Sequence, residues 1–289
     1  MPELHINDCE LHYELLGSRS SDCVVFIPGL GMPLQTWRER YAAPLADSGY
    51  SILLFNLRGT APSETTPPPY SLELLADDCS KLIEALGFQR VLLVGYSLGS
   101  RIAAHMVLRG LSAVTGLFLV APHLGRSSAC GAAIIEAEGA IYKTNSYPPP
   151  SYMALCDLLQ ICSWRELVDD RTTRSMLRAV SATDYRDVGR QAQFFAATSE
   201  HDDHAQLHRI AVKTRVIGFE QDVITPSRLC AEVATAIPGA QYLEISGAGH
   251  AGFFVRRNEI LAALRRFVEE LGWSTAACAD SAQLARSDT

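Results

Sequence analysis

The segment from Val91 to His105, VLLVGYSLGSRIAAH, constrains the fold more than any other part of the chain. Four apolar residues typical of a buried strand run directly into GYSLG, and a small-residue helical pattern follows. A residue at the tip of a tight strand-to-helix turn is pushed out of the sheet, and glycines two positions before and after it let the neighbouring backbone pass without Cβ clashes. The pattern therefore predicts that Ser97 is a nucleophile held above the sheet. The alternative is an ordinary turn in which Ser97 caps the helix.

Apolar runs and helical patterns alternate along the rest of the chain. Residues 4–6 and 11–16 predict two short strands of an N-terminal hairpin, because NDCE between them is typical of a turn. Further strands are expected over residues 24–27, 51–55, 91–94, 117–120, 214–219 and 242–245. Helices are expected around 36–49, 71–86, 229–237 and 258–271, and another directly after Ser97. This alternation predicts an α/β fold with a mostly parallel central sheet flanked by helices.

The alternation breaks after residue 122. Residues 123–210 lack apolar strand runs, contain SYPPPSY and have mostly helical patterns. We therefore expect a helical cap there, inserted into a core that comprises residues 1–122 and 211–273. Residues 274–289 are small and polar without a periodic apolar face, which predicts a disordered tail.

Composition and charge exclude several classes of partner. The chain has 289 residues, 48% of them hydrophobic, which is enough for one large core. A formal charge of −7 and the lack of a basic run argue against nucleic acid. The first ten residues do not resemble a secretory signal, and no apolar run approaches the roughly 20 residues of a membrane-spanning helix. We expect a soluble, cytoplasmic protein that binds a small molecule and no membrane, and the sequence leaves its oligomeric state open.

A serine hydroxyl needs a base to remove its proton and a third group to hold that base. His250 lies in the glycine-rich segment ISGAGHAGFF after the last expected strand, and Asp222 lies in GFEQDVITP after the preceding one. Both follow strand ends, as Ser97 does, so the three side chains are expected at the same edge of the sheet. Glu220 is the competing carboxylate. The alternatives are a solvent-exposed loop histidine and a solvated turn carboxylate.

Five segments together resemble the α/β-hydrolase fold superfamily. FIPGLGMPLQTW, NLRGTAPSE, GYSLGS, GFEQDVITP and GAGHAGFF are similar, in that order, to its oxyanion segment, RG loop, nucleophile elbow, acid loop and histidine loop. The resemblance implies that Ser97 is the nucleophile, that His250 is the general base and acid, and that Asp222 orients His250. It also implies that the backbone N–H groups of Leu30 and Leu98 form the oxyanion hole. No cofactor is implied.

The resemblance also has two departures and an open choice of chemistry. Pro28 and Asn56 replace a histidine and an aspartate of the family pattern, so the hydrogen bonds that commonly brace the oxyanion loop must be made by other groups or be absent. The nearest branches are enol-lactonases, cofactor-free haloperoxidases and esterases, which implies cleavage of an ester, thioester or lactone through an acyl-enzyme. The C-terminal motifs are also similar to tailoring enzymes of antibiotic biosynthesis. The alternatives are therefore a non-hydrolytic cyclase, lyase or epimerase of secondary metabolism, or a binding protein that kept the fold.

Aromatic residues of the cap are candidates for substrate binding. We expect Phe194, Phe195 and Trp164 to line an apolar cleft beneath a lid, which would favour bulky apolar substrates. The alternative is that these aromatics pack inside the cap.

Three histidines near the end of the insertion have helical spacing. His201, His204 and His208, with two aspartates between the first two, could form a metal-binding face. A polar surface segment is the favoured interpretation, because nothing else in the sequence suggests an activated water. We therefore expect no metal.

Overall fold

The structure is a computed structural model that describes residues 2–17, 22–125, 127–199 and 203–273. The expected tail, residues 274–289, lies outside the described residues. Within the described ranges the seven cysteines are free thiols. None of the helices in these ranges is both long and apolar enough to cross a lipid bilayer.

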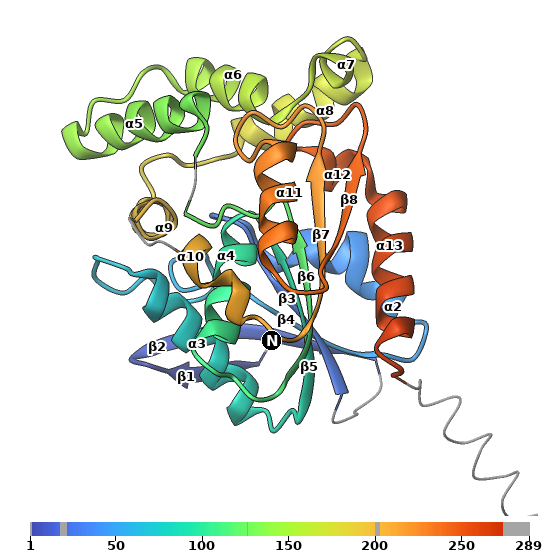
Figure 1. Cartoon of the computed structure of the whole chain (residues 1–289). Coiled ribbons are helices and arrows are strands. Elements are labelled where there is room, and N and C mark those ends of the chain that lie inside the picture. The colour runs from blue at the N-terminus through green and yellow to red at the C-terminus, as the bar shows by residue number, and fades with distance from the viewer. Residues whose placement is uncertain (1, 18–21, 126, 200–202, 274–289) are drawn as a thin grey trace, which may run out of the picture.

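An eight-stranded sheet organises the described residues, with the strand order β1-β2-β4-β3-β5-β6-β7-β8 (Figure 1). Its strands are β1 (Glu3–Ile6), β2 (Cys9–Leu16), β3 (Asp22–Ile27), β4 (Ser51–Phe55), β5 (Arg90–Tyr96), β6 (Val114–Val120), β7 (Lys213–Phe219) and β8 (Gln241–Ile245). The β1–β2 hairpin is antiparallel and joins β4 antiparallel, whereas every other neighbouring pair is parallel. The predicted mostly parallel sheet is confirmed.

Helices cover both faces of the sheet, so its central strands are buried on both sides. The core helices are α1 (Leu34–Trp37), the π-helix η1 (Arg38–Ala42), α2 (Ala43–Ala46), α3 (Leu72–Ala85), α4 (Leu98–Leu108), α11 (Ser227–Ala236), α12 (Gly252–Val255) and α13 (Arg257–Glu270). Apolar residues of α3, α4 and α11 share one cluster with one face of the sheet. Those of α1, η1, α2, α12 and α13 share a second cluster with the other face. The core thus consists of a sheet between two layers of helices, as the sequence predicts.

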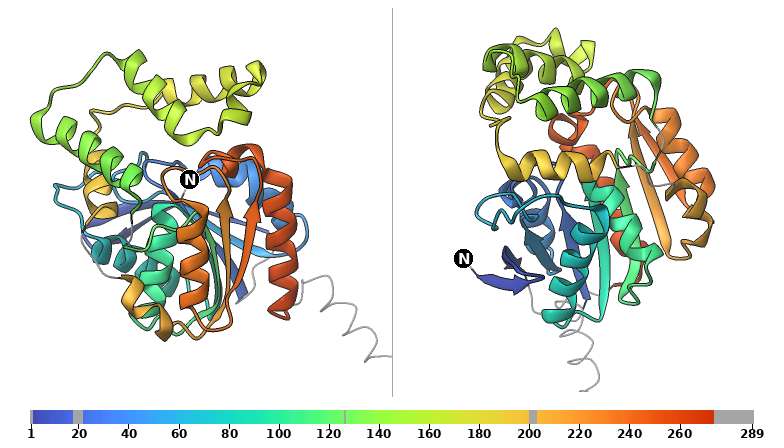
Figure 2. Two further views of the ribbon diagram at one scale, coloured as in Figure 1. Left: turned by 45° about the horizontal axis from the view of Figure 1, so that its top comes forward. Right: turned by 90° about the vertical axis from the view of Figure 1, so that its left-hand side faces the viewer.

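A helical segment connects β6 to β7 and lies over the carboxyl ends of the parallel strands (Figure 2). It contains α5 (Ala129–Thr144), α6 (Pro150–Ile161), α7 (Trp164–Leu167), α8 (Asp170–Ser181), α9 (Val188–Ala197), α10 (Asp203–Gln206) and the 3-10 helix η2 (Leu207–Arg209). Apolar residues of α6 and α8 form a third, smaller cluster together with Ala251 of the histidine loop. In contrast, Ala192 and Ala196 of α9 and Leu207 of η2 belong to the cluster beside α3 and α4. Residues from about 188 onward therefore pack as part of the core, although the sequence pattern groups them with the insertion.

A buried ion pair fastens the RG loop to the sheet-covering helix α3. Nε of Arg58 donates to Oδ2 of Asp78 at 2.8 Å, and Nη2 donates to Oδ1 at 2.9 Å. Both side chains are almost fully buried. The remaining donors of Arg58 reach Thr66 Oγ1 and the carbonyl of Asn7. The guanidinium thus joins the N-terminal hairpin, the RG loop and α3 at one point.

We expect Asp78→Asn to lower the free energy of unfolding by about 3 kcal/mol or more, because it leaves the buried guanidinium without a counter-charge. The matched control is Asp77→Asn. Asp77 is partly exposed, pairs with Lys81 at the surface and accepts the Asn7 amide at 3.4 Å, so the loss of its charge should cost about 1 kcal/mol or less. Urea unfolding of the two variants measures the difference, and equal losses would contradict the structural role of the Arg58–Asp78 pair.

Candidate active site

Ser97 occupies a strained turn between β5 and α4. Its backbone has φ +52° and ψ −117°, which an L-residue rarely adopts. The glycines on either side permit the turn: a Cβ at Gly95 would lie 2.4 Å from the carbonyl oxygen of Gly99, and a Cβ at Gly99 would lie 2.1 Å from that of Ile27. The Ser97 N–H donates to the carbonyl of Val120 on the neighbouring strand at 2.9 Å. The turn therefore holds the serine side chain above the sheet edge.

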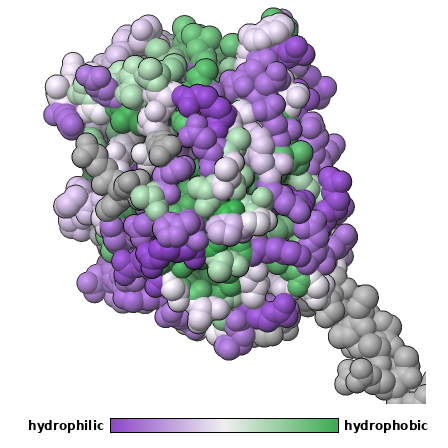
Figure 3. All heavy atoms as spheres, viewed as in Figure 1, coloured by the Kyte–Doolittle hydropathy of each residue, from purple (hydrophilic) through white to green (hydrophobic). Residues whose placement is uncertain are grey.

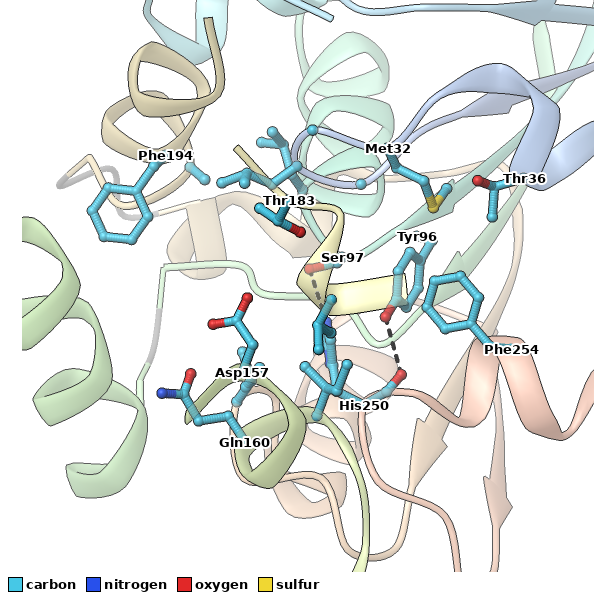
Figure 4. Close-up of a pocket in the computed structure, with 18 of the residues that line it drawn as sticks. Met32, Thr36, Tyr96, Ser97, Asp157, Gln160, Thr183, Phe194, His250 and Phe254 are labelled. Atoms are coloured by element: carbon cyan, nitrogen blue, oxygen red, sulfur yellow. Dashed lines mark hydrogen bonds between the residues drawn. The ribbon is translucent and has the colours of Figure 1, made fainter. Parts of the chain in front are cut away.

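A hydrogen-bonded chain joins Ser97, His250 and Asp222. Nε2 of His250 lies 3.1 Å from Oγ of Ser97 (Figure 4), and Nδ1 lies 2.7 Å from Oδ2 of Asp222. His250 and Asp222 are 6% and 4% exposed, so solvent does not compete for these contacts. The three side chains, which come from loops after β5, β8 and β7, thus meet as the sequence analysis expects. This arrangement can move a proton from the serine hydroxyl to the imidazole.

The two candidate carboxylates have different partners. Oδ1 of Asp222 accepts the N–H groups of Ile224 at 2.8 Å and Thr225 at 2.9 Å, and Oδ2 accepts the Thr225 hydroxyl at 2.7 Å. These donors fix the carboxylate beside the imidazole. Glu220 instead accepts the N–H of Gly247 at 2.7 Å and braces the histidine loop. Only Asp222 of the two contacts His250.

The loop that carries His250 is held from the sheet and from the cap. The hydroxyl of Tyr96 donates to the carbonyl of His250 at 3.0 Å (Figure 4). Burial raises the pKa of Tyr96 well above its ordinary value, so this hydroxyl stays protonated. From the cap, Oε2 of Glu166 on α7 accepts the N–H of Gly249 at 3.2 Å. The imidazole is therefore oriented by more than its contact with Asp222.

The two residues whose N–H groups are expected to form an oxyanion hole line the same cavity. Leu98 is the first residue of α4, where a backbone N–H has no partner within the helix and the helix dipole favours negative charge. Leu30 lies in a tight turn closed by the N–H of Met32, which donates to the carbonyl of Gly29 at 3.1 Å. Both leucines line the cavity that contains Ser97.

Gln193, which the sequence analysis does not identify, braces the oxyanion loop. Its Oε1 accepts the N–H of Gly31 at 2.8 Å, and its Nε2 donates to the carbonyl of Arg58 at 2.7 Å and to Oγ1 of Thr60 at 2.8 Å. The side chain is fully buried on α9. Gln193 therefore ties the loop after β3 to the RG loop. A glutamine in a helical insertion carries no sequence signal for this role, because the contact spans 162 residues of chain.

Asn56 supplies a second brace at one of the two departures from the family pattern. Its Oδ1 accepts the N–H of Leu34 at the start of α1, at 2.6 Å, and its Nδ2 donates to the carbonyl of Ala61 at 2.8 Å. Asn56 is fully buried. The bracing hydrogen bonds are thus made by the two amides of Asn56 and Gln193.

A cavity of about 560 Å³ lies between the sheet edge and the cap, and Ser97 and His250 open into it. Its walls are mixed. Apolar side chains contribute one group of lining residues, among them Met32, Ile134, Ile161, Met176, Val180, Phe194 and Phe254. Polar side chains contribute another, which includes His123, Glu138, Asp157, Gln160, Thr183 and Arg190. This volume is suitable for a small organic molecule.

Of the three cap aromatics expected to bind substrate, Phe194 alone lines this cavity. Phe195 is 37% exposed and packs beside the Phe194 ring, because adjacent residues of a helix point in different directions. Trp164 is 61% exposed, at the start of α7 on the outer surface of the cap. The hydrophobic residues at the top of the molecule in Figure 3 lie over α6. The predictions for Phe195 and Trp164 are therefore wrong.

His123 is a further cavity residue that the sequence analysis misses. It follows β6, and its Nε2 lies 2.9 Å from the hydroxyl of Ser127. Burial lowers the pKa of His123 to about 4, so its imidazole is neutral at physiological pH. It adds a polar group to the cavity without adding charge.

The histidines of the possible metal face are only partly described. His201 lies outside the described residues, and Nδ1 of His208 contacts the carbonyl of Ala205. Among the residues that the structure describes, no group of three or more histidine, cysteine, aspartate or glutamate side chains is arranged to hold a metal ion.

Comparisons with known proteins identify the family of the chain. The model of the alpha/beta hydrolase fold family matches residues 22–256. "Putative non-heme bromoperoxidase BpoC" of Mycobacterium tuberculosis H37Rv is 31% identical over 249 residues, which are 86% of this chain and 94% of that protein. A crystal structure of BpoC superimposes with a TM-score of 0.83 at 29% identity, covering 90% of this chain and 96% of that one. The enol-lactonase of Burkholderia xenovorans LB400 shares the fold, with a TM-score of 0.80 at 23% identity, covering 93% of this chain and 100% of that one. The chain belongs to the α/β-hydrolase fold family.

Proposed function

We propose that the protein is a serine hydrolase that cleaves an ester, thioester or lactone of a small molecule through an acyl-enzyme on Ser97. The observation that carries the proposal is the hydrogen-bonded chain from Asp222 through His250 to Ser97. The strained elbow and the cavity of about 560 Å³ around Ser97 support it. Membership of a hydrolase family supports it further.

The first half of the proposed reaction forms the acyl-enzyme. Nε2 of His250 takes the proton of the Ser97 hydroxyl as Oγ attacks the carbonyl carbon, and the electron pair of the C=O bond moves to its oxygen. The N–H groups of Leu30 and Leu98 stabilise this oxyanion, and each such donor contributes about 2.7 to 4 kcal/mol to transition-state stabilisation. When the oxyanion collapses, the bond to the leaving group breaks, and the imidazolium protonates the alcohol, thiol or enol that departs.

The second half releases the acid. His250 takes a proton from water, the hydroxide attacks the acyl carbon, and Ser97 leaves as an alkoxide that His250 reprotonates. Asp222 keeps the proton of Nδ1 directed toward itself, so that Nε2 is free to accept in both halves. A cyclase, lyase or epimerase in the same cavity would use His250 for acid–base chemistry and would not acylate Ser97.

The prediction that tests acylation uses a fluorophosphonate probe. The wild-type protein should be labelled on Ser97, and Ser97→Ala should lose the label and lower kcat for ester hydrolysis by roughly 10⁴-fold or more, while the thermal unfolding curve stays that of the wild type. Ser175→Ala is the matched control, because Ser175 lines the same cavity without a contact to His250, and it should keep the label. Hydrolysis by Ser97→Ala at the wild-type rate would exclude the acyl-enzyme.

A second prediction separates the two carboxylates of the acid loop. Asp222→Asn should lower kcat by roughly 10⁴-fold, because the asparagine amide favours the wrong imidazole tautomer. Glu220→Gln should cost less than about tenfold, since a glutamine oxygen can still accept the Gly247 N–H. Steady-state kinetics on a p-nitrophenyl ester provides the comparison. If Glu220→Gln were the more damaging change, the assignment of Asp222 would be wrong.

A further inference from the structure

The cap side of the cavity carries charged groups that the proposed acyl transfer does not use. Asp157 and Gln160 project from α6 toward the cavity, and Figure 4 places them on one side of Ser97, with Met32 and Phe254 on the other. Glu138 on α5 and Arg190 on α9 line the same cavity. A substrate bound at Ser97 would therefore meet charged and polar side chains of α5, α6 and α9.

Within this group of lining side chains, two carboxylates face one guanidinium. Nη2 of Arg190 lies 3.8 Å from Oε1 of Glu138, and the same oxygen accepts the hydroxyl of Tyr142 at 2.5 Å. Asp157 makes no ion pair with any described residue. Burial raises the pKa of both Glu138 and Asp157 above the ordinary range. The single guanidinium of Arg190 thus interacts electrostatically with both carboxyl groups.

Asp157 has one carboxylate oxygen with a hydrogen-bond partner among the described residues and one without. Its Oδ2 accepts the hydroxyl of Tyr185 at 2.7 Å, which fixes the side chain. Its Oδ1 has no hydrogen bond to a described residue and is not among the fully buried atoms that lack a partner. Because Asp157 lines the cavity, this second oxygen is available to a bound molecule. A carboxylate oxygen in such a place requires a donor, either water or a group of the substrate.

We propose that Asp157 is a specificity-determining residue that selects esters carrying a hydrogen-bond donor, a hydroxyl or an ammonium group, on the part of the molecule that reaches α6. The donor binds Oδ1 of Asp157, while the apolar remainder contacts Met32, Phe194 and Phe254. This inference rests on the proposed function, because it is read from turnover at Ser97. The structural alternative is that Asp157 serves only to tie α6 to Tyr185.

The test begins with the wild-type enzyme and two ester series. In the first, p-nitrophenyl esters carry a straight acyl chain of about four to six carbons that ends in methyl, hydroxyl, ammonium or carboxylate. In the second, the same end groups stand on the alcohol of a butyrate ester. In at least one series, kcat/KM for the hydroxyl or ammonium ester should exceed that for the methyl ester by about tenfold, and the carboxylate ester should be poorest.

Two variants then assign that preference. Asp157→Leu removes both charge and acceptor and should abolish the preference for either donor, whereas Asp157→Asn keeps an acceptor and should lose the preference for ammonium more than that for hydroxyl. Asp170→Asn is the matched control, because it removes an exposed carboxylate from α8 of the cap, and its selectivity should equal that of the wild type. Thermal unfolding confirms that each variant is folded.

The outcomes separate this inference from the proposed function. Failure of the wild type to hydrolyse any ester in a Ser97-dependent way would overturn the proposed function. Hydrolysis of methyl-ended esters without a donor preference in either series would overturn the role of Asp157 alone. A donor preference that survives in Asp157→Leu would also overturn the role of Asp157. The ratio of kcat/KM between donor and methyl esters should stay unchanged in this variant if Asp157 only ties α6 to Tyr185.

Discussion

The first turn of α4 touches the backbone of the sheet at Gly99, and the position of Ser97 depends on that contact. A Cβ at Gly99 would lie 2.1 Å from the carbonyl oxygen of Ile27, so a larger residue would push the helix away from β3. The close approach forces the chain through the rare backbone angles of Ser97, at a cost of order 1–3 kcal/mol. Packing of apolar residues of α4 against β5 and β6 offsets this strain. The nucleophile position is thus fixed by backbone contacts, which leaves its side chain free to react.

The helices between β6 and β7 do more than cover the cavity, because two of them hold loops that line it. Gln193 on α9 binds the oxyanion loop at Gly31, and Glu166 on α7 binds the histidine loop at Gly249. Neither side chain contacts Ser97 in the described structure. A displacement of these helices would nevertheless alter the positions of the oxyanion donors and of His250. Changes in the cap are therefore expected to affect kcat as well as KM, as with other lids that complete a catalytic site.

Local sequence patterns predict the fold, and they predict that Ser97, Asp222 and His250 lie together, as they do in the structure. The strands and the elbow follow from short apolar runs and from glycines, and Asp222 and His250 follow from their places after strand ends. The contacts of Gln193 could not be predicted, since they join segments more than 130 residues apart and any buried amide could make them. Phe195 and Trp164 were misassigned for a related reason. Aromatic composition indicates that a helix has an apolar side, and it does not say whether that side faces the cavity or the solvent.

Helix α6 also shows that composition does not reveal which side chains face the cavity. Its surface carries Tyr152, Leu155 and Leu159 at 57%, 45% and 56% exposure, while Asp157 and Gln160 line the cavity. Met153, Ala154 and Leu158 of the same helix are buried, so α6 has apolar residues on both its inner and its outer side. Placing a carboxylate in a partly apolar cavity opposes folding unless the carboxylate is hydrogen-bonded. The single hydroxyl of Tyr185 satisfies one oxygen of Asp157. A hydrogen-bond donor on a bound substrate, as proposed above, would satisfy the other oxygen.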